Sequence, residues 1–429
     1  MLRRGCWRTA LARGLATGLL LSGMLWSAQD AEARKVTLEG WDYVKERVDL
    51  YQKKADEYHK LHPDVEIKFT TVPFGEYFSK ILTSMAGGSP PDMFIHHPSQ
   101  VSSFEGMLSP FPKDLFPLDK MDDNLAFTAG FVVNGEFYLY PVGLLSALVF
   151  YNKDLWEEAG MGNVPQTWAE LRTAARKLTQ KDGGVLKVAG FSFAKEIKYL
   201  WPDLNYQMGG YLFNEKKTGV TWDTPEGQKA IDLIDAMLRD GISDLPNHLL
   251  DFAAGKAAME YGWGWKRVGY SKVKGLRWDV FQLPTTDGDN FPARARSAVA
   301  LGFSVPYNVP AADKAETFKF LQWLYSSDDF LVQLNELMGT VPTRRSLWSH
   351  STILKDNVFR TTVKQLPYTV LPGEFPSWVE SILDEMQTAI TVKGVAARLA
   401  LKQAQEKGDA WLKKEPAGWV IERVTRPRK

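Results

Sequence analysis

The chain has very little cysteine and no excess of charge of either sign. Its 429 residues include a single cysteine, Cys6, so no disulfide can form within the chain. Its 52 basic and 51 acidic residues give a formal net charge of +1. A nucleic-acid-binding protein needs a concentrated basic surface, which this balance argues against. We therefore expect no nucleic-acid partner.

Long apolar runs are also missing, and the one apolar segment near the start is short. Arg3 and Arg4 belong to a basic leader that precedes a mostly apolar segment from Leu15 to Trp26, and Ala31-Glu32-Ala33 fits a small-x-small cleavage site. The apolar segment is shorter than the roughly 20 residues that a membrane-spanning helix needs. We predict that residues 1–33 are a signal peptide removed on export, by the general secretory route or, if Arg3-Arg4 is a twin-arginine signal, by the twin-arginine route.

The mature chain that remains is long and nearly neutral. Without residues 1–33 its formal charge becomes −1, and it has no cysteine, so no lipid anchor is expected. Its length favours two domains, because single hydrophobic cores stop growing at about 250 to 300 residues. The 15 tryptophans and 15 tyrosines can fill large cores or form flat walls for a ligand.

The first part of the mature chain alternates between strand and helix patterns. Apolar residues predict strands at 36–41, 65–72 and 93–95, and repeats at helical spacing predict helices at 44–61 and 76–86. Such alternation is typical of a parallel, doubly wound sheet with helices on its faces.

Residues 141–178 show the clearest local signals. The run from Leu144 to Tyr151 is almost entirely apolar, which predicts a strand buried on both faces. Asn152 then opens a helix that stops at Gly160. Thr167 and Glu170 are spaced as a capping box, which predicts a second helix up to Leu178.

The amino-acid sequence of these segments resembles that of the extracellular solute-binding proteins of sugar ABC transporters, family 1. This is the family of maltose-binding-protein-like proteins. The resemblance extends over almost all of residues 36–413. It rests on His62-Pro63, Tyr77, Gly88-x-Pro90-Pro91-Asp92, Pro141, Tyr151-Asn152-Lys153-Asp154-Leu155, Ala159-Gly160, Pro165-x-Thr167-Trp168-x-Glu170-Leu171, Phe252 to Met259 with Trp265, Gly302 to Val305, the helix from Ala315 to Tyr325, and Gly339 to Arg344.

The resemblance implies an α/β fold of two lobes, each a mostly parallel sheet flanked by helices, joined by a multi-strand hinge. Lobe 1 would comprise residues 34–142 and 303–343, and lobe 2 residues 144–298 and 346–429. The hinge would lie near 141–144, 297–302 and 341–346.

The same resemblance implies a role in uptake rather than catalysis. The protein would be a periplasmic monomer, not embedded in the membrane, that closes around a mono- or oligosaccharide and delivers it to the permease subunits of an ABC transporter. No cofactor and no metal are expected.

Ligands of open α/β sheets collect outside the carboxyl ends of strands, where loops converge. A sugar needs aromatic rings against its C–H faces and planar polar groups along its hydroxyls. Trp265 falls where the family has a stacking tryptophan. The predicted ligand-binding residues are Trp41, Asp42, Tyr43, His96, His97, Gln100, Trp201, Trp263, Trp265, Arg344 and Trp378.

Two alternatives remain open, an anionic ligand and a glycoside hydrolase, whereas two possible metal sites are disfavoured. An anionic ligand such as a phosphorylated polyol would need cations in the cleft, for which Lys266-Arg267 and Arg344-Arg345 are the candidates. A secreted glycoside hydrolase would need paired carboxylates, and no catalytic motif is present. Adjacent histidines point to opposite faces of an extended chain, which disfavours a metal at His96-His97, and 287–290 fits a turn better than a calcium site.

Overall fold

The computed structural model describes residues 35–97, 104, 106–117, 120, 132–133, 136–246, 251–286, 295–299, 301–371, 377–414 and 423–424. The predicted signal peptide at 1–33, the candidate Gln100 and the predicted turn at 287–290 lie outside these residues. Among the described residues, no helix has the length and apolar character needed to cross a membrane.

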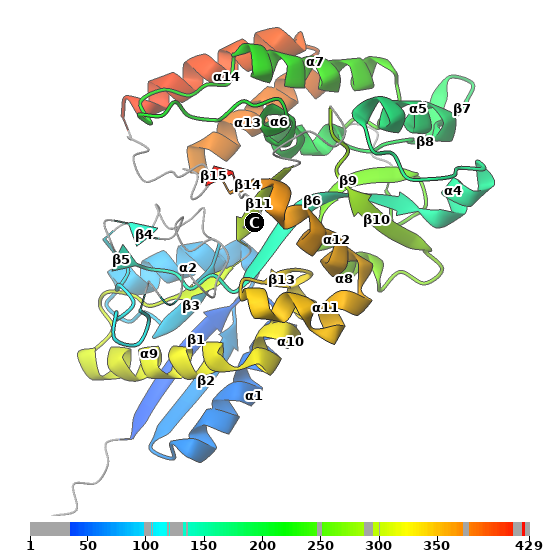
Figure 1. Cartoon of the computed structure of the whole chain (residues 1–429). Helices are drawn as coiled ribbons and strands as arrows, with labels where there is room; N and C mark the ends of the chain where they lie inside the picture. Colours follow the sequence, from blue (N-terminus) through cyan, green and yellow to red (C-terminus); the bar gives the residue numbers. More distant parts are fainter. Residues whose placement is uncertain are drawn as a thin grey trace, which may run out of the picture. The chain divides into compact units, whose positions relative to one another are not determined.

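The first sheet combines three early strands with one that comes much later. Its spatial order is β12 (Gly302–Ser304), β3 (Met93–His96), β1 (Val36–Asp42) and β2 (Val65–Thr71) (Figure 1). The three early strands pair in parallel, as predicted, whereas β12 pairs antiparallel with β3. Four helices accompany this sheet: α1 (Lys45–Leu61), α2 (Phe74–Ala86), α9 (Ala311–Ser326) and α10 (Asp328–Met338).

Helices α1 and α2 are amphipathic, as their spacing predicts. α1 contacts β2 and α10, and α9 contacts β1. The side chains of Tyr51, Tyr58 and Tyr77 are almost fully buried. The Tyr77 hydroxyl lies 2.8 Å from the carbonyl oxygen of Trp41 and 2.7 Å from that of Ile95, so α2 fixes the carboxyl ends of β1 and β3.

The second sheet is organised around one long buried strand, β6 (Gly143–Asn152), of which only Tyr151 is not fully buried. This confirms the prediction of a strand covered on both faces. The strands around it are β9 (Met259–Trp263), β10 (Trp278–Gln282), β11 (Ala295–Val299), β13 (Val341–Pro342), β14 (Thr369–Leu371) and β15 (Arg423–Val424).

The expectation of a mostly parallel sheet in each lobe is wrong for this second sheet. β9, β10, β11 and β13 all pair antiparallel with β6, and only β11 and β14 pair in parallel. The resemblance implied parallel sheets in both lobes, whereas the strand–helix alternation that supports this direction lies only at the start of the chain. A strand buried on both faces is typical of a parallel sheet, but burial alone does not fix the direction of its partners.

Helices cover the second sheet. The helix signals after β6 are confirmed: Asn152 caps α4 (Lys153–Glu158) and Thr167 forms a capping box with Glu170 at the start of α5 (Trp168–Leu178). α6, α7, α13 and α14 contact one another in pairs (Figure 1). The remaining helices are α6 (Ile197–Gln207), α7 (Pro225–Arg239), α8 (Lys266–Tyr270), α11 (Ser351–Lys355), α12 (Asn357–Gln365), α13 (Ser377–Thr391) and α14 (Ala397–Leu412). Two small hairpins, β4 (Val132–Val133) with β5 (Glu136–Phe137) and β7 (Gln180–Asp182) with β8 (Val185–Val188), complete the strands.

Segments that run from one sheet to the other lie side by side. β11 ends at Val299 in the second sheet and β12 begins at Gly302 in the first. Val142, immediately before β6, donates its main-chain N–H to the carbonyl of Leu301 at 3.3 Å. Thr343 donates its own N–H to the carbonyl of Val142 at 3.4 Å. Three segments distant in sequence are therefore held together by main-chain hydrogen bonds.

Candidate functional site

Strand β1 contains, next to its last residue, a tryptophan that packs against its own sheet. Trp41 is only 6% exposed. Its indole N–H donates to the Glu39 carboxylate at 2.8 Å, and the Lys80 ammonium lies 4.7 Å from its ring centre. Both interactions hold the ring against the first sheet, so little of its surface is accessible.

Asp42 is completely buried and has all its hydrogen bonds inside the protein. It accepts the Arg47 guanidinium at 2.7 and 2.6 Å, and the main-chain N–H groups of Tyr43 and Val44 at 2.5 and 3.1 Å. This arrangement fixes the turn into α1. Tyr43 is half-buried, and its ring packs edge-on against Phe74 at 5.0 Å.

The two histidines after β3 differ in their surroundings. His96 is fully buried between the Ser304 hydroxyl at 2.8 Å and the His97 carbonyl at 3.0 Å. Burial lowers the pKa of His96 to about 3, although the carbonyl opposes the shift. Within the described residues, no group of three or more His, Cys, Asp or Glu side chains could hold a metal ion.

His97, by contrast, has an exposed side chain. Desolvation by the surrounding protein nevertheless lowers the pKa of His97 to about 4, with Glu380 opposing this shift and Arg296 adding to it. His97 follows a strand of the first sheet, whereas Arg296 and Glu380 come from β11 and α13.

Two of the tryptophans predicted to bind ligand lie in the core. Trp201 has no exposed surface, and its indole N–H donates to the Gly227 carbonyl at 3.1 Å. Trp378 is 5% exposed and stacks in parallel on Trp411, with ring centres 6.2 Å apart. Both rings fill space between the helices that cover the second sheet.

The tryptophans at the end of β9 divide into one buried and one accessible ring. Trp263 is 7% exposed and its indole N–H has no hydrogen-bond partner within the part of the chain that the structure describes, whereas Trp265 is 52% exposed. Trp265 immediately precedes α8. Gly264 packs closely against Gly339, because a Cβ atom built on Gly264 would lie 2.6 Å from the Gly339 carbonyl oxygen. The backbone that carries Trp265 is therefore held in place.

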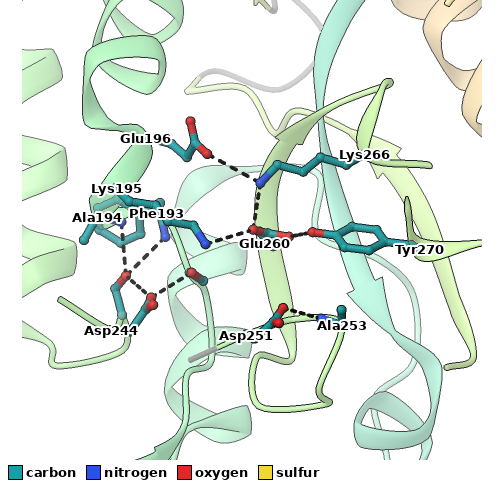
Figure 2. Close-up of polar contacts among 12 residues, drawn as sticks. Phe193, Ala194, Lys195, Glu196, Asp244, Asp251, Ala253, Glu260, Lys266 and Tyr270 are labelled. Atoms are coloured by element: carbon teal, nitrogen blue, oxygen red, sulfur yellow. Dashed lines mark hydrogen bonds and ion pairs between the residues drawn. The ribbon is translucent and has the colours of Figure 1, made fainter. Parts of the chain in front are cut away.

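A buried charge cluster supports the same segment (Figure 2). Glu260 on β9 accepts from the Lys266 ammonium at 2.7 Å and from the Tyr270 hydroxyl. Lys266 also lies 3.5 Å from the Glu196 carboxylate, and Lys195 lies 3.7 Å from Glu260. Burial raises the pKa of Glu196, although Lys266 opposes this. The cluster ties α8 to the turn before α6.

The cations that the sequence offered for an anionic ligand are largely engaged by the protein. Arg267 pairs with Asp356 at 2.5 Å, and Lys266 is part of the cluster above. Arg344 pairs with Asp328 and donates to the Tyr325 carbonyl. The Arg344 side chain is thus directed at α9 and α10.

The sequence reasoning missed a second polar group, which lies around Arg296 of β11. The Arg296 guanidinium lies 5.1 Å from the ring centre of Trp263 and 5.2 Å from that of Tyr199 on α6. The Tyr199 hydroxyl donates to Glu380, which also lies 3.5 Å from the Lys198 ammonium. Glu380 remains 49% exposed. A charged residue inside the strand sequence ARSAV was the one available signal.

Burial and neighbouring charges have opposite effects on the pKa values of Arg296 and Glu380. Burial alone would lower the pKa of Arg296, but Asp203 and Tyr261 outweigh it and raise that pKa. Burial likewise raises the pKa of Glu380, but the Tyr199 hydroxyl, Lys198 and Arg296 outweigh it and lower that pKa. Arg296 therefore stays cationic and Glu380 anionic, and Tyr199 contacts both, the first through its ring and the second through its hydroxyl.

Comparisons with known proteins agree on one family. The model of the family described as "Bacterial extracellular solute-binding protein" matches residues 44–329. A putative binding protein of Brucella abortus (strain 2308) is 23% identical over 429 residues, covering 95% of this chain and 99% of that protein. The maltotriose-binding protein of Pyrococcus abyssi is 23% identical over 374 residues, covering 83% of this chain and 79% of that protein.

A solved structure shows the same fold. The crystal structure of the cyclic alpha-maltosyl-1,6-maltose binding protein from Arthrobacter globiformis superposes with a TM-score of 0.75 at 19% sequence identity. The match covers 88% of this chain and 99% of that protein. The predicted two-lobed α/β fold is thereby confirmed.

Proposed function

Because the chain belongs to the bacterial extracellular solute-binding protein family, we propose that it captures a mono- or oligosaccharide between its two lobes and delivers it to an ABC importer. The partners would be the permease subunits in the membrane. The protein would act as a monomer and would perform no chemistry on its ligand.

The observation that carries this proposal is the combination of accessible aromatic and polar side chains around the end of β9. Trp265 exposes half of its surface, and the partly buried Tyr199 lies beside Arg296 and Glu380. Aromatic faces suit the C–H surfaces of a sugar ring, while planar charged groups suit its hydroxyls. Sugar-binding relatives such as the maltotriose-binding protein point to the same ligand class.

The proposed lobes meet at the hydrogen-bonded segments described above. Lobe 1 would comprise residues 34–142 and 303–343, and lobe 2 residues 144–298 and 346–429. The hinge would lie near 141–144, 297–302 and 341–346. Several adjacent strands can bend together without unfolding either core, which allows closure around a ligand. The membership of β12 in the first sheet and of β11 in the second supports this division.

We place the protein in the periplasm. The basic leader, the short apolar segment and the cleavage motif at Ala31-Glu32-Ala33 support export. Expression with the full leader should give a periplasmic protein whose first residue, read by N-terminal sequencing, is Arg34. A protein that keeps residues 1–33 in the cytoplasm would contradict this placement.

The ligand class is tested with the mature protein and a panel of neutral and acidic mono- and oligosaccharides. We expect one of them to change the intrinsic tryptophan fluorescence. The dissociation constant should lie in the micromolar range, which corresponds to a binding free energy of about −8 kcal/mol. Mass spectrometry of material that co-purifies should identify a sugar. A folded protein that responds to no sugar contradicts the proposal, and release of reducing sugar on prolonged incubation would indicate a glycoside hydrolase instead.

A further inference from the structure

The side chain of Arg296 is buried and charged, yet two of its nitrogen donors make no hydrogen bond to the described residues. The residue is 8% exposed, and Nε and Nη2 have no hydrogen-bond partner among the described residues. A buried donor without a partner has lost its hydrogen bonds to water without replacement, and this penalty is larger when the donor is charged. Native structures rarely retain such groups unless a ligand, water or ion completes them.

Asp203 balances the charge of Arg296 without forming a hydrogen bond to these two donors. One Asp203 oxygen accepts the main-chain N–H of Arg296 at 2.9 Å, and the other accepts the Tyr261 hydroxyl at 2.6 Å. The Arg296 Nε atom lies 3.4 Å from the first oxygen, which is an ion-pair distance without hydrogen-bond geometry. The carboxylate thus stabilises the buried cation, while Nε–H and Nη2–H have no hydrogen-bond partner among the described residues.

Two aromatic rings, those of Tyr199 and Trp263, lie against the Arg296 guanidinium. The planes of Tyr199 and Trp263 stand at 84° to each other, and both ring centres lie about 5 Å from the guanidinium carbon. Such cation–π contacts favour the cationic form of the side chain. Among the described residues, the buried indole N–H of Trp263 also has no partner. Arg296 Nε, Arg296 Nη2 and Trp263 Nε1 are all nitrogen donors, so the group that would pair with them is an acceptor.

Nε–H and Nη2–H lie on one edge of the guanidinium and point in the same direction. Two parallel donors match the two oxygens of a carboxylate or phosphate better than they match a single hydroxyl. A sugar hydroxyl would also bring a hydrogen that needs its own acceptor. Glu380, a second acidic group near Arg296, is already paired with Lys198 and the Tyr199 hydroxyl.

We propose that Arg296, together with the indole N–H of Trp263, binds an acidic group of the ligand, so that the captured solute is a sugar that carries a carboxylate or a phosphate. This inference rests on the proposed function, capture of a sugar, and specifies the chemical class of that sugar. A uronic acid residue supplies a carboxylate on a ring that also has C–H faces for aromatic contact.

The test is calorimetric titration of the mature protein with matched sugars: glucose against glucuronate, galactose against galacturonate, the corresponding trimers, and glucose 6-phosphate. We expect an acidic sugar to bind at least about 100-fold more tightly than its neutral counterpart, as is typical when a buried charge loses its partner. Preference for glucuronate or for glucose 6-phosphate distinguishes a carboxylate from a phosphate.

Variants then connect the preference to the residue. R296Q should lose about 100-fold or more in affinity for the acidic sugar, and R296K should lose an intermediate amount because an ammonium cannot form the paired contact. W263F, which keeps the ring and removes the N–H, should lose about 5- to 30-fold. R398Q is the matched control, since Arg398 is an exposed arginine paired with Asp232. Thermal melting checks the fold, and R296K keeps the charge beside Asp203 if R296Q does not fold.

Two results would overturn the inference. A wild-type protein that binds the neutral sugar as tightly as the acidic one shows that no acidic group is recognised, while sugar capture itself stands. An R296Q or R296K variant that binds the acidic sugar with wild-type affinity removes Arg296 from the site. A folded wild-type protein that binds neither neutral nor acidic sugars contradicts the proposed function as well. This result differs from equal binding of the two classes, which contradicts only the inference about the acidic group.

Discussion

Thr343 donates its hydroxyl hydrogen to the main-chain carbonyl of Pro141 at 2.6 Å, although the two residues are 202 positions apart in the chain. The contact joins the segment that follows β13 to the segment that precedes β6. Thr343 is 1% exposed, so the hydrogen bond is shielded from water. Together with the main-chain bonds of Val142 to Leu301 and Thr343, it holds the segments between the two sheets in register.

Replacing Thr343 with valine tests the importance of this contact for stability. The change T343V keeps the shape of the side chain and leaves the Pro141 carbonyl without this buried donor. We expect a loss of about 1 to 3 kcal/mol in the free energy of unfolding, measured by urea titration. T343S keeps the hydroxyl and should lose less. Equal stability of T343V and the wild type would show that the contact is dispensable.

Replacing Trp265 separates ligand binding from stability. Because the ring is 52% exposed, W265A should change the melting temperature little, while sugar affinity falls by more than about 1 kcal/mol if the ring stacks on the ligand. W201A is the contrasting variant, since Trp201 has no exposed surface and its removal should cost about 3 to 5 kcal/mol of stability. Unchanged affinity of W265A for a sugar that the wild type binds would exclude Trp265 from the site.

Removing Lys266 tests the charge cluster behind Trp265. K266M deprives the buried Glu260 carboxylate of its partner at 2.7 Å, which should cost about 3 kcal/mol in urea unfolding because a buried charge loses its partner. K272M is the control, because Lys272 and its partner Glu46 are both largely exposed and such pairs contribute less than about 1 kcal/mol. A K266M variant as stable as K272M would show that the cluster does not stabilise the fold.

His96 should make the fold sensitive to acid. Its pKa falls from 6.5 to about 3 on burial, so the unfolded chain takes up a proton at a higher pH than the folded protein does. The stability from neutral His96 is therefore complete above about pH 6.5 and is lost as the pH falls towards 3. At pH 5 the loss should be about 2 kcal/mol.

The measurement is the free energy of unfolding of wild type and H96Q between pH 7.5 and 4.5. Glutamine does not titrate, so the stability of H96Q should fall less steeply than that of the wild type. H62Q, which replaces an exposed histidine, is the control and should follow the wild-type curve. Parallel curves for wild type and H96Q would mean that His96 is not held neutral by burial.

Local patterns in the sequence were sufficient for most elements of the fold. The Asn152 cap and the Thr167–Glu170 capping box depend on residues a few positions apart, and both are present as predicted. The direction of the strands around β6 was not predictable in this way, because it depends on how long connections return to the sheet. The antiparallel partners of β6 come from residues 259–299 and 341–342.

The site was less predictable for a related reason. Trp263 and Trp265 are two positions apart and equally aromatic, yet one is buried and the other half exposed, because β9 ends between them. Trp201 and Trp378 could not be recognised as core residues before their helices were placed. Arg296 was missed because its neighbours Tyr199 and Trp263 lie far away in the sequence.

The most direct test of the account is a crystal structure of the mature protein with the sugar that it binds most tightly. We predict that the sugar lies between the two lobes, with a ring face against Trp265 and an acidic group within about 3.2 Å of Arg296 Nε and Nη2. A sugar bound elsewhere, with no contact to Trp265, Tyr199 or Arg296, would contradict the central claim that this cluster is the capture site.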